Sequence, residues 1–231
     1  MFDISPTEWT AILLSLRVGV VATLVATPIG IGVAWLLARG RFWGKPLVDA
    51  VIYLPLVLPP VVTGYLLLLL MGRRGLIGEW LADHLGIVFA FRWTGAALAC
   101  GVMSFPLLVR PIRLSIEAID QRLEQAASTL GASRWKVFTT VTLPLALPGI
   151  LAGMVLGFAK AIGEFGATIT FVSNIPGETQ TISSAIYSLI QTPDGDTAAL
   201  RLVIVSVVIA TAALIASEVF AWRATQRLHG R

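Results

Sequence analysis

Five long apolar runs constrain the fold of this chain more than any other feature of its sequence. A helix needs about 20 consecutive, mostly apolar residues to cross a hydrocarbon core about 30 Å thick. Only 13% of the 231 residues are charged, whereas soluble domains carry about 25%. We therefore expect an all-α, polytopic membrane helix bundle, with one transmembrane domain over residues 1–231. The five predicted spans are residues 12–38, 48–71, 94–114, 145–163 and 202–221.

The positions of Lys and Arg predict how these spans are oriented. If the N-terminus lies outside, the inner loops and the C-terminal tail hold 11 of the 17 basic residues. Cytoplasmic loops carry an excess of Lys and Arg, so we expect the N-terminus outside and the C-terminus inside. This distribution also assigns the net charge of +4 to membrane orientation rather than to nucleic-acid binding. The predicted inner residues are Arg39, Arg41, Lys45, Arg110, Arg113, Arg122, Arg134, Lys136, Arg223, Arg227 and Arg231.

Proline is frequent inside the predicted spans, and each proline removes a backbone donor and tends to kink a helix. The densest case is the segment LPLVLPP at residues 54–60, so we expect the second span to be bent or to begin late. Bent helices either shape packing alone or line a pathway that opens and closes. The prolines concerned are Pro28, Pro55, Pro59, Pro60 and Pro106.

A polar stretch at residues 120–148 interrupts the apolar chain and falls on the predicted cytoplasmic side. Leu123, Ala126, Ala127 and Leu130 recur at helical spacing, which predicts a short helix with one apolar stripe. We expect Asp120 to cap its start and Gly131, in a left-handed conformation, to end it. A helix of about 10 residues is too short to be stable alone. Its alanine-rich face suits a groove on a partner protein, and an ordinary helix resting on the bilayer surface is the alternative.

Two segments on the predicted outer side are shorter than a span. Residues 72–93 are amphipathic, and we expect them to lie along the outer face with Trp80 and Trp93 at the headgroup level. A sixth span there is disfavoured by its charged residues. Residues 174–178, NIPGE, predict a turn, and residues 182–191 predict a short helix that dips into the membrane without crossing it.

Lys160 and Glu164 stand one helical turn apart in an apolar region. Ionisable residues at membrane depth are costly and usually face a cavity or each other. They form either a self-satisfied ion pair or part of a water-filled path for an anion, with Lys160 supplying positive potential. Arg17 lies near the outer end of the first span, and we expect its long side chain to reach the headgroups.

Several patterns associated with enzymes are missing from the sequence. No phosphate-binding loop of the type G-x-x-x-x-G-K-[ST] occurs, and no H-E-x-x-H or paired-cysteine motif. His84 and His229 are isolated, and the single cysteine, Cys100, is expected to be a buried small hydrophobe. We therefore predict no catalytic residues, no metal site and no cofactor. The N-terminal residues lack a basic region and a cleavage site, so we expect no removable signal peptide.

The polar stretch resembles the EAA loop of ABC importer permeases. The matching residues are Glu124, Gln125, Ala126 and Ala127, then Gly131 and Ala132, then Leu143 and Pro144. Counting back from Gly131, the position that usually holds Glu in that loop is Gln125 here. The run GEFGATITFVSNIPGET at residues 163–179 resembles molybdate ABC transporter permeases, as do residues 54–62 and 103–107, and the resemblance extends over essentially the whole chain.

The resemblance implies a type I ABC importer permease that carries molybdate across the inner membrane as a multi-pass protein. It implies a homodimer served by two cytoplasmic ATPase subunits and a periplasmic molybdate-binding protein. The cytoplasmic coupling loop would be about residues 115–144, and its helix would sit in a groove of the ATPase. The coupling residues that the resemblance implies are Glu124, Gln125, Ala126, Ala127, Leu130, Gly131 and Ala132.

Other functions stay open from the residues alone. Within the same class, the substrate could instead be sulfate, tungstate or another oxyanion. From a different class, the chain could be a channel or a carrier driven by an ion gradient, which would need neither ATP nor an ATPase. A membrane-embedded enzyme is disfavoured because no nucleophile, base and metal ligand cluster in the sequence.

Overall fold

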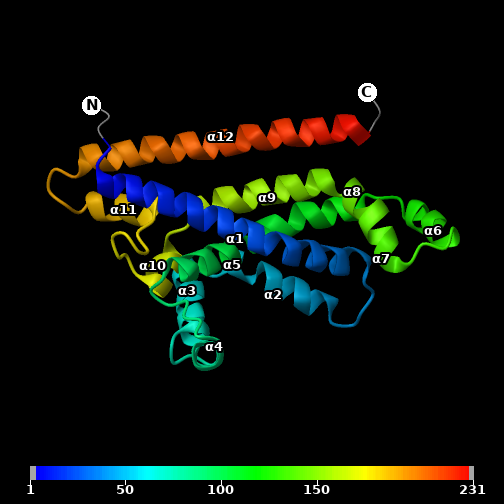
Figure 1. Ribbon diagram of the computed structural model, residues 1–231, viewed down its shortest axis with the longest axis horizontal. Coiled ribbons are helices and arrows are strands. Elements are labelled where there is room, and N and C mark those ends of the chain that lie inside the picture. Colours follow the sequence, from blue (N-terminus) through cyan, green and yellow to red (C-terminus); the bar gives the residue numbers. More distant parts are fainter. Residues whose placement is uncertain (1–3, 229–231) are drawn as a thin grey trace.

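The computed structural model describes residues 4–228, and every regular element within that range is a helix (Figure 1). Arg231 and His229 lie outside the described residues. In chain order the helices are α1 Pro6–Arg39, α2 Lys45–Val57, α3 Pro60–Met71, α4 Gly78–Leu85, α5 Trp93–Glu117, α6 Gln121–Thr129, α7 Arg134–Val137, the π-helix η1 Phe138–Thr142, α8 Leu143–Leu145, α9 Leu147–Ile162, α10 Gly166–Val172, α11 Ile182–Leu189 and α12 Asp196–Leu228.

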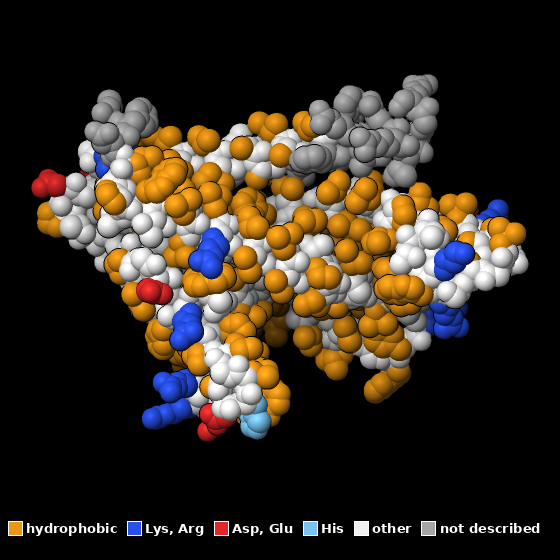
Figure 2. All heavy atoms as spheres, viewed as in Figure 1, with side chains coloured by type: hydrophobic (Ala, Val, Ile, Leu, Met, Phe, Trp, Pro, Cys, Tyr) orange, Lys and Arg blue, Asp and Glu red, His pale blue; other side chains and the backbone are white. Residues whose placement is uncertain are grey.

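The long helices lie side by side as a bundle (Figure 1). α5 packs against both α1 and α9, and α12 packs mainly against α9 and α11. α1 and α12 begin at one end of the bundle, and α6 lies at the opposite end, where α12 finishes. On the predicted topology, the first end is the outer one and the α6 end is the inner one. Figure 2 shows basic side chains near α6–α7 and near α3–α4, with a mainly hydrophobic surface between them.

The expectation of a membrane helix bundle with about five spans is confirmed, but one predicted span is broken and another begins at a bend. α1, α5 and residues 196–216 of α12 are each long and apolar enough to cross a membrane. The predicted span at residues 48–71 is instead two helices, α2 and α3, that meet at 116°. The predicted span at residues 145–163 is α9, which meets the α7–α8 segment at 67°.

Proline explains the first of these breaks but does not break every helix that contains it. α2 ends at Val57, and α3 begins at Pro60 after Leu58 and Pro59 adopt extended backbone conformations. The predicted bend in this span is therefore confirmed. Pro28 lies inside the continuous α1, and Pro106 lies inside the continuous α5. Both α1 and α5 are unbroken despite these prolines, and α5 packs against α1 and α9.

Small residues let the central helices approach closely. A Cβ atom added at Gly153 of α9 would lie 2.5 Å from the carbonyl oxygen of Leu108 in α5. A Cβ added at Gly149, one turn earlier, would lie 2.6 Å from the carbonyl oxygen of Pro111. Small residues of this kind are typical of helix interfaces in membranes, where close van der Waals packing replaces the hydrophobic effect.

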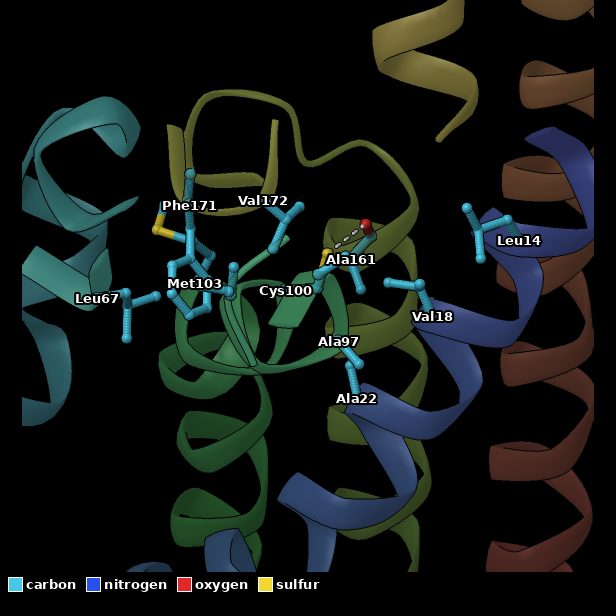
Figure 3. Close-up of a cluster of buried hydrophobic side chains, with 14 residues drawn as sticks. Leu14, Val18, Ala22, Leu67, Ala97, Cys100, Met103, Ala161, Phe171 and Val172 are labelled. Atoms are coloured by element: carbon cyan, nitrogen blue, oxygen red, sulfur yellow. Dashed lines mark hydrogen bonds between the residues drawn. The ribbon is translucent and has the colours of Figure 1, made fainter. Parts of the chain in front are cut away.

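A buried cluster ties the outer ends of the helices together (Figure 3). Phe171 and Val172 of α10 are fully buried in it, next to Met103 of α5 and Leu67 of α3. The Cys100 thiol donates a hydrogen bond to the Ala161 carbonyl oxygen over 3.4 Å, which links α5 to the end of α9. Cys100 is 1% exposed, so its predicted role as a buried small hydrophobe is confirmed.

The two segments that were predicted to be shorter than a span are short in the structure. Between the end of α3 and the start of α5, the eight-residue α4 is too short to cross a membrane, and Trp80 is exposed on it. The predicted turn at residues 174–178 is present, with Gly177 at φ +80°. α11 follows as a short helix, and the Ile182 amide donates to the Ser15 hydroxyl of α1 over 2.7 Å.

Candidate coupling site

The helix α6 forms at the inner end of the bundle with the predicted caps. The Asp120 carboxylate accepts a hydrogen bond from the Arg122 amide over 2.9 Å at the start of the helix. At the end, Gly131 has φ +84°, and its amide donates to the Ser128 carbonyl oxygen. The Ala132 amide donates to the Ala127 carbonyl oxygen, which completes the pair of bonds of a Schellman motif. Glycine suits residue 131 because it adopts the left-handed conformation without the strain that a Cβ atom causes.

The predicted apolar stripe of α6 is largely exposed. Leu123 is 51% exposed and Leu130 is 89% exposed, Ala126 is exposed and Ala127 is half-buried. α6 has no fully buried residue, so its own chain provides little of the apolar burial that stabilises a nine-residue helix. A small alanine-rich surface between two leucines is therefore available to a partner, in the way that helices dock into grooves.

A flank of α6 beside this stripe is fixed to the bundle through Glu124. One carboxylate oxygen accepts from Arg39 Nε over 2.9 Å, and the other accepts from the Thr142 hydroxyl over 2.6 Å. A second guanidinium nitrogen of Arg39 donates to the Ile119 carbonyl oxygen over 3.1 Å. Thr142 is 1% exposed, so no water replaces its bond. Glu124 thus connects α6 to the last residue of α1 and to η1.

Aromatic packing adds a second connection between the loop and the bundle. Phe138 at the start of η1 packs edge-to-face on Trp35 of α1, with ring centroids 5.8 Å apart, and contacts Trp135 at 5.6 Å. Trp135 itself is 73% exposed, whereas Val137 is buried. The five-residue π-helix is an uncommon element that often marks functional sites. The sequence did not identify Arg39 and Thr142 as residues of the coupling site. The position of Arg39, directly after the predicted span at residues 12–38, was the available signal for Arg39.

A polar cleft of about 820 Å³ lies beside α6. It separates α6 from the segment that joins α1 to α2, and Arg39, Arg41 and Lys45 line one side of it. Glu124 and Gln125 line the other side. Since Glu124 is the one acidic residue among those that line the cleft, the lining carries net positive charge.

Lys160 and Glu164 lie far from α6, near the outer end of α9. Lys160 Nζ is 2.8 Å from a carboxylate oxygen of Glu164, and the other oxygen accepts from the Ala167 amide over 3.0 Å. Glu164 is 2% exposed and sits in the break between α9 and α10, while the Lys160 side chain is 29% exposed. The structure thus contains the ion pair, and it leaves the ammonium partly accessible.

No group of three His, Cys, Asp or Glu side chains suited to a metal ion occurs in the part of the chain that the structure describes. His84 stacks on Trp80, with ring centroids 5.1 Å apart, and shares a hydrogen bond with the Trp80 carbonyl oxygen. This arrangement accounts for His84 without a ligand.

Comparison with known proteins decides the family of this helix bundle. Residues 26–226 match the family described as "Binding-protein-dependent transport system inner membrane component". The chain belongs to this family. The permease is 64% identical over 211 residues to "Molybdenum transport system permease protein ModB" of Escherichia coli K12, covering 91% of this chain and 92% of that one. It is 58% identical over 221 residues to the Haemophilus influenzae protein of the same name, covering 96% of each chain.

A further relative and two solved structures place the permease more broadly. It is 38% identical over 195 residues to "Sulfate transport system permease protein CysT" of Escherichia coli K12, covering 84% of this chain and 69% of that one. A chain of a bacterial alginate ABC importer has a TM-score of 0.72 at 20% identity, covering 95% of this chain and 80% of that one. A chain of the MetNI methionine ABC transporter has a TM-score of 0.71 at 16% identity, covering 95% and 98%.

The resemblance to molybdate ABC transporter permeases is therefore confirmed, and the fold is that of a type I ABC importer permease. The chain is a multi-pass membrane permease subunit.

Proposed function

We propose that this permease imports molybdate across the inner membrane, driven by ATP that a separate ATPase subunit hydrolyses. The observation that carries the coupling part of this proposal is α6, whose apolar stripe is largely exposed while Glu124, on the flank beside it, bonds to the bundle. The substrate part is supported by 64% identity to a molybdenum transport permease over 91% of the chain.

In this proposal α6 is a lever that transmits motion of the ATPase to the spans. The docked stripe of α6 would follow the ATPase surface as the nucleotide sites close. The Glu124 carboxylate would pass that displacement to α1 through Arg39 and to η1 through Thr142. Because η1 and α8 lead into α9 through the 67° break, rotation of the loop would tilt α9 relative to α5.

Binding free energy limits how far ATP can shift the conformational equilibrium of the permease. ATP can shift the permease between inward-open and outward-open states only as far as the ATPase binds one state better than the other. If the connection between α6 and the spans were flexible, only part of that free-energy difference would be transmitted to the spans. The two charge-assisted hydrogen bonds on Glu124 are the short, strong contacts that keep the connection stiff.

The proposed assembly contains two copies of this chain, two ATPase subunits and one periplasmic molybdate-binding protein. Each copy carries one α6, so two copies provide one lever for each of the two ATPase subunits. The binding protein would deliver the oxyanion at the outer end of the bundle, where α4 and α11 lie. Selectivity would reside mainly in that protein, and the permease itself would perform no catalysis.

The pathway proposal concerns Lys160 and Glu164. Glu164 is held by the Ala167 amide and holds Lys160 in turn, so the ammonium has a fixed position near the outer end of α9. A partly exposed ammonium would attract an anion, and its carboxylate partner would prevent tight trapping. This pair would therefore lie along the translocation path as a weak attractive site rather than a high-affinity one.

The test is uptake by proteoliposomes that contain the purified permease, with and without the ATPase subunit, ATP and the binding protein. We expect molybdate uptake only when all of them are present. Uptake with an ion gradient alone would show a carrier or channel instead. Competition by tungstate and sulfate in the same vesicles tests the substrate, and sulfate is included because of the 38% identity to a sulfate permease. Full import of sulfate without molybdate import would overturn the substrate assignment.

Two variants of α6 test docking separately from substrate choice. Ala127→Trp adds a large side chain to the proposed contact surface, and Gly131→Val forces a β-branched residue into φ +84°. We expect both variants to remain in the membrane and to lose ATP-driven uptake. Gln180→Ala, on the outer side, is the control and should transport normally. Normal uptake by both α6 variants would contradict the docking proposal.

A further inference from the structure

An apolar groove of about 500 Å³ runs between α1, α2 and α5, on the outer half of the bundle. We call it the α1–α5 groove. Thr94 is the only polar side chain among the residues that line it. Val25 and Ile29, which line its α1 side, are 60% and 57% exposed, so the groove is open along its length. Its main lining residues are Val21, Val25, Ile29, Leu98, Val102 and Phe105.

A cation stands at the outer end of the α1–α5 groove. Arg17 lies one helical turn before Val21 on α1, and Trp93 begins α5 directly before Thr94. The Arg17 guanidinium carbon is 3.7 Å from the centroid of the Trp93 ring, a cation–π contact that fixes the charge in place. None of the ion pairs found between residues 4 and 228 includes Arg17.

The depth of Arg17 matches the phosphate level of the outer leaflet. Arg39 ends α1 on the inner side, where it bonds to Glu124. A hydrocarbon core of about 30 Å corresponds to about 20 helical residues, so counting back from Arg39 places the outer boundary near Gly19. Arg17 and Trp93 therefore lie at the headgroup level, where tryptophan is enriched.

The length of the groove suits one acyl chain. From Thr94 to Phe105 along α5 the groove is about 16 Å long, close to the thickness of one leaflet, about 15 Å. An acyl chain that extends inward from a headgroup beside Arg17 would therefore follow the groove over most of one leaflet.

We propose that the α1–α5 groove binds one outer-leaflet phospholipid, with its phosphate on Arg17 and one acyl chain along Val25 and Phe105. The planar guanidinium offers parallel donors along its edges that fit phosphate oxygens, and the Trp93 ring covers one of its faces without occupying those donors. The bound lipid fills the space between α2 and the α1–α5 pair, which the chain leaves open. It acts as a wedge that sets how far α2 stands from the rest of the bundle.

Native mass spectrometry of the purified full-length permease in mild detergent tests the proposal. We expect one phospholipid per chain to remain bound to the wild type. Arg17→Ala should lower the retained fraction about tenfold, the factor that a charge-assisted hydrogen bond contributes. Arg73→Ala removes the same charge from an exposed outer position away from the groove and should leave retention unchanged. Equal loss in both variants would show nonspecific attraction of lipid and overturn the site.

A second variant blocks the groove without touching the cation. A Cβ added at Gly101 would meet nothing closer than 3.9 Å, so Gly101→Leu places its side chain in the groove without a backbone clash. We expect Gly101→Leu to elute as a folded protein on size exclusion and to lose the lipid. A photo-crosslinking residue at Val25 should attach to phospholipid. Retention by Gly101→Leu and Arg17→Ala alike, or a crosslink from residue 25 to a second copy of the chain, would refute the proposal.

Discussion

The hydrogen bond between Thr142 and Glu124 gives the sharpest test of how α6 is connected to the spans. Thr142→Val keeps the shape of the side chain and removes only the hydroxyl that donates to Glu124 over 2.6 Å. The acceptor is a carboxylate and the donor is 1% exposed, so the loss is worth about 1.5–3 kcal/mol. That energy changes the balance between attached and detached α6 by about 10- to 100-fold.

The assay is the ratio of molybdate imported to ATP hydrolysed in proteoliposomes that contain the assembled transporter. We expect Thr142→Val to lower this ratio about tenfold or more, while ATP hydrolysis continues, because the ATPase still docks on α6. Thr140→Val is the matched control: Thr140 lies in the same π-helix, and its hydroxyl bonds only to the Lys136 carbonyl oxygen. Equal ratios for both variants would refute the role of Glu124 as a connector.

Three other predictions concern contacts outside the loop. Lys160→Met leaves the buried Glu164 carboxylate without its cationic partner and should cost about 3–5 kcal/mol of stability. The double variant Lys160→Met, Glu164→Gln should recover the melting temperature but not molybdate uptake, and normal uptake by the double variant would show that the pair does not lie on the path. Gly64→Val places a Cβ 2.5 Å from a carbonyl oxygen of α10, so limited proteolysis should cut near α3 faster than in the wild type; an unchanged digestion pattern would argue against tight α3–α10 packing. Arg201→Met leaves Glu8, 5% exposed, without its partner at 2.9 Å; the melting temperature should fall, and Glu8→Gln in addition should recover it, whereas no recovery would assign the loss to packing.

The parts of the fold that depend on local sequence were predictable. Apolar length identified the spans, and the caps of α6 followed from Asp120 and Gly131 because capping depends on neighbouring residues alone. The bend near Pro59 was predictable for the same reason. Its angle of 116° was not, because that angle depends on α3 packing against α10, more than 100 residues later in the chain.

The connection through Glu124 was not predictable from spacing. Glu124, Arg39 and Thr142 come from three separate elements, and only the folded bundle brings Arg39 and Thr142 within 3 Å of the Glu124 carboxylate. The family pattern directed attention to Gln125 as the usual glutamate position, whereas here Gln125 is exposed and Glu124 makes the internal bonds. The exposed stripe of α6, in contrast, was already visible as a helical repeat of Leu and Ala.

We propose that α6 faces the cytoplasm and is covered by the ATPase, and labelling of one residue tests this. Leu130→Cys places an exposed cysteine on α6 for reaction with a membrane-impermeant maleimide, while the natural Cys100 is buried. Residue 130 should react in inside-out vesicles but not in right-side-out vesicles, and added ATPase should protect it. Reaction from the outer side, or equal reaction with and without the ATPase, would contradict docking of α6 on a cytoplasmic ATPase.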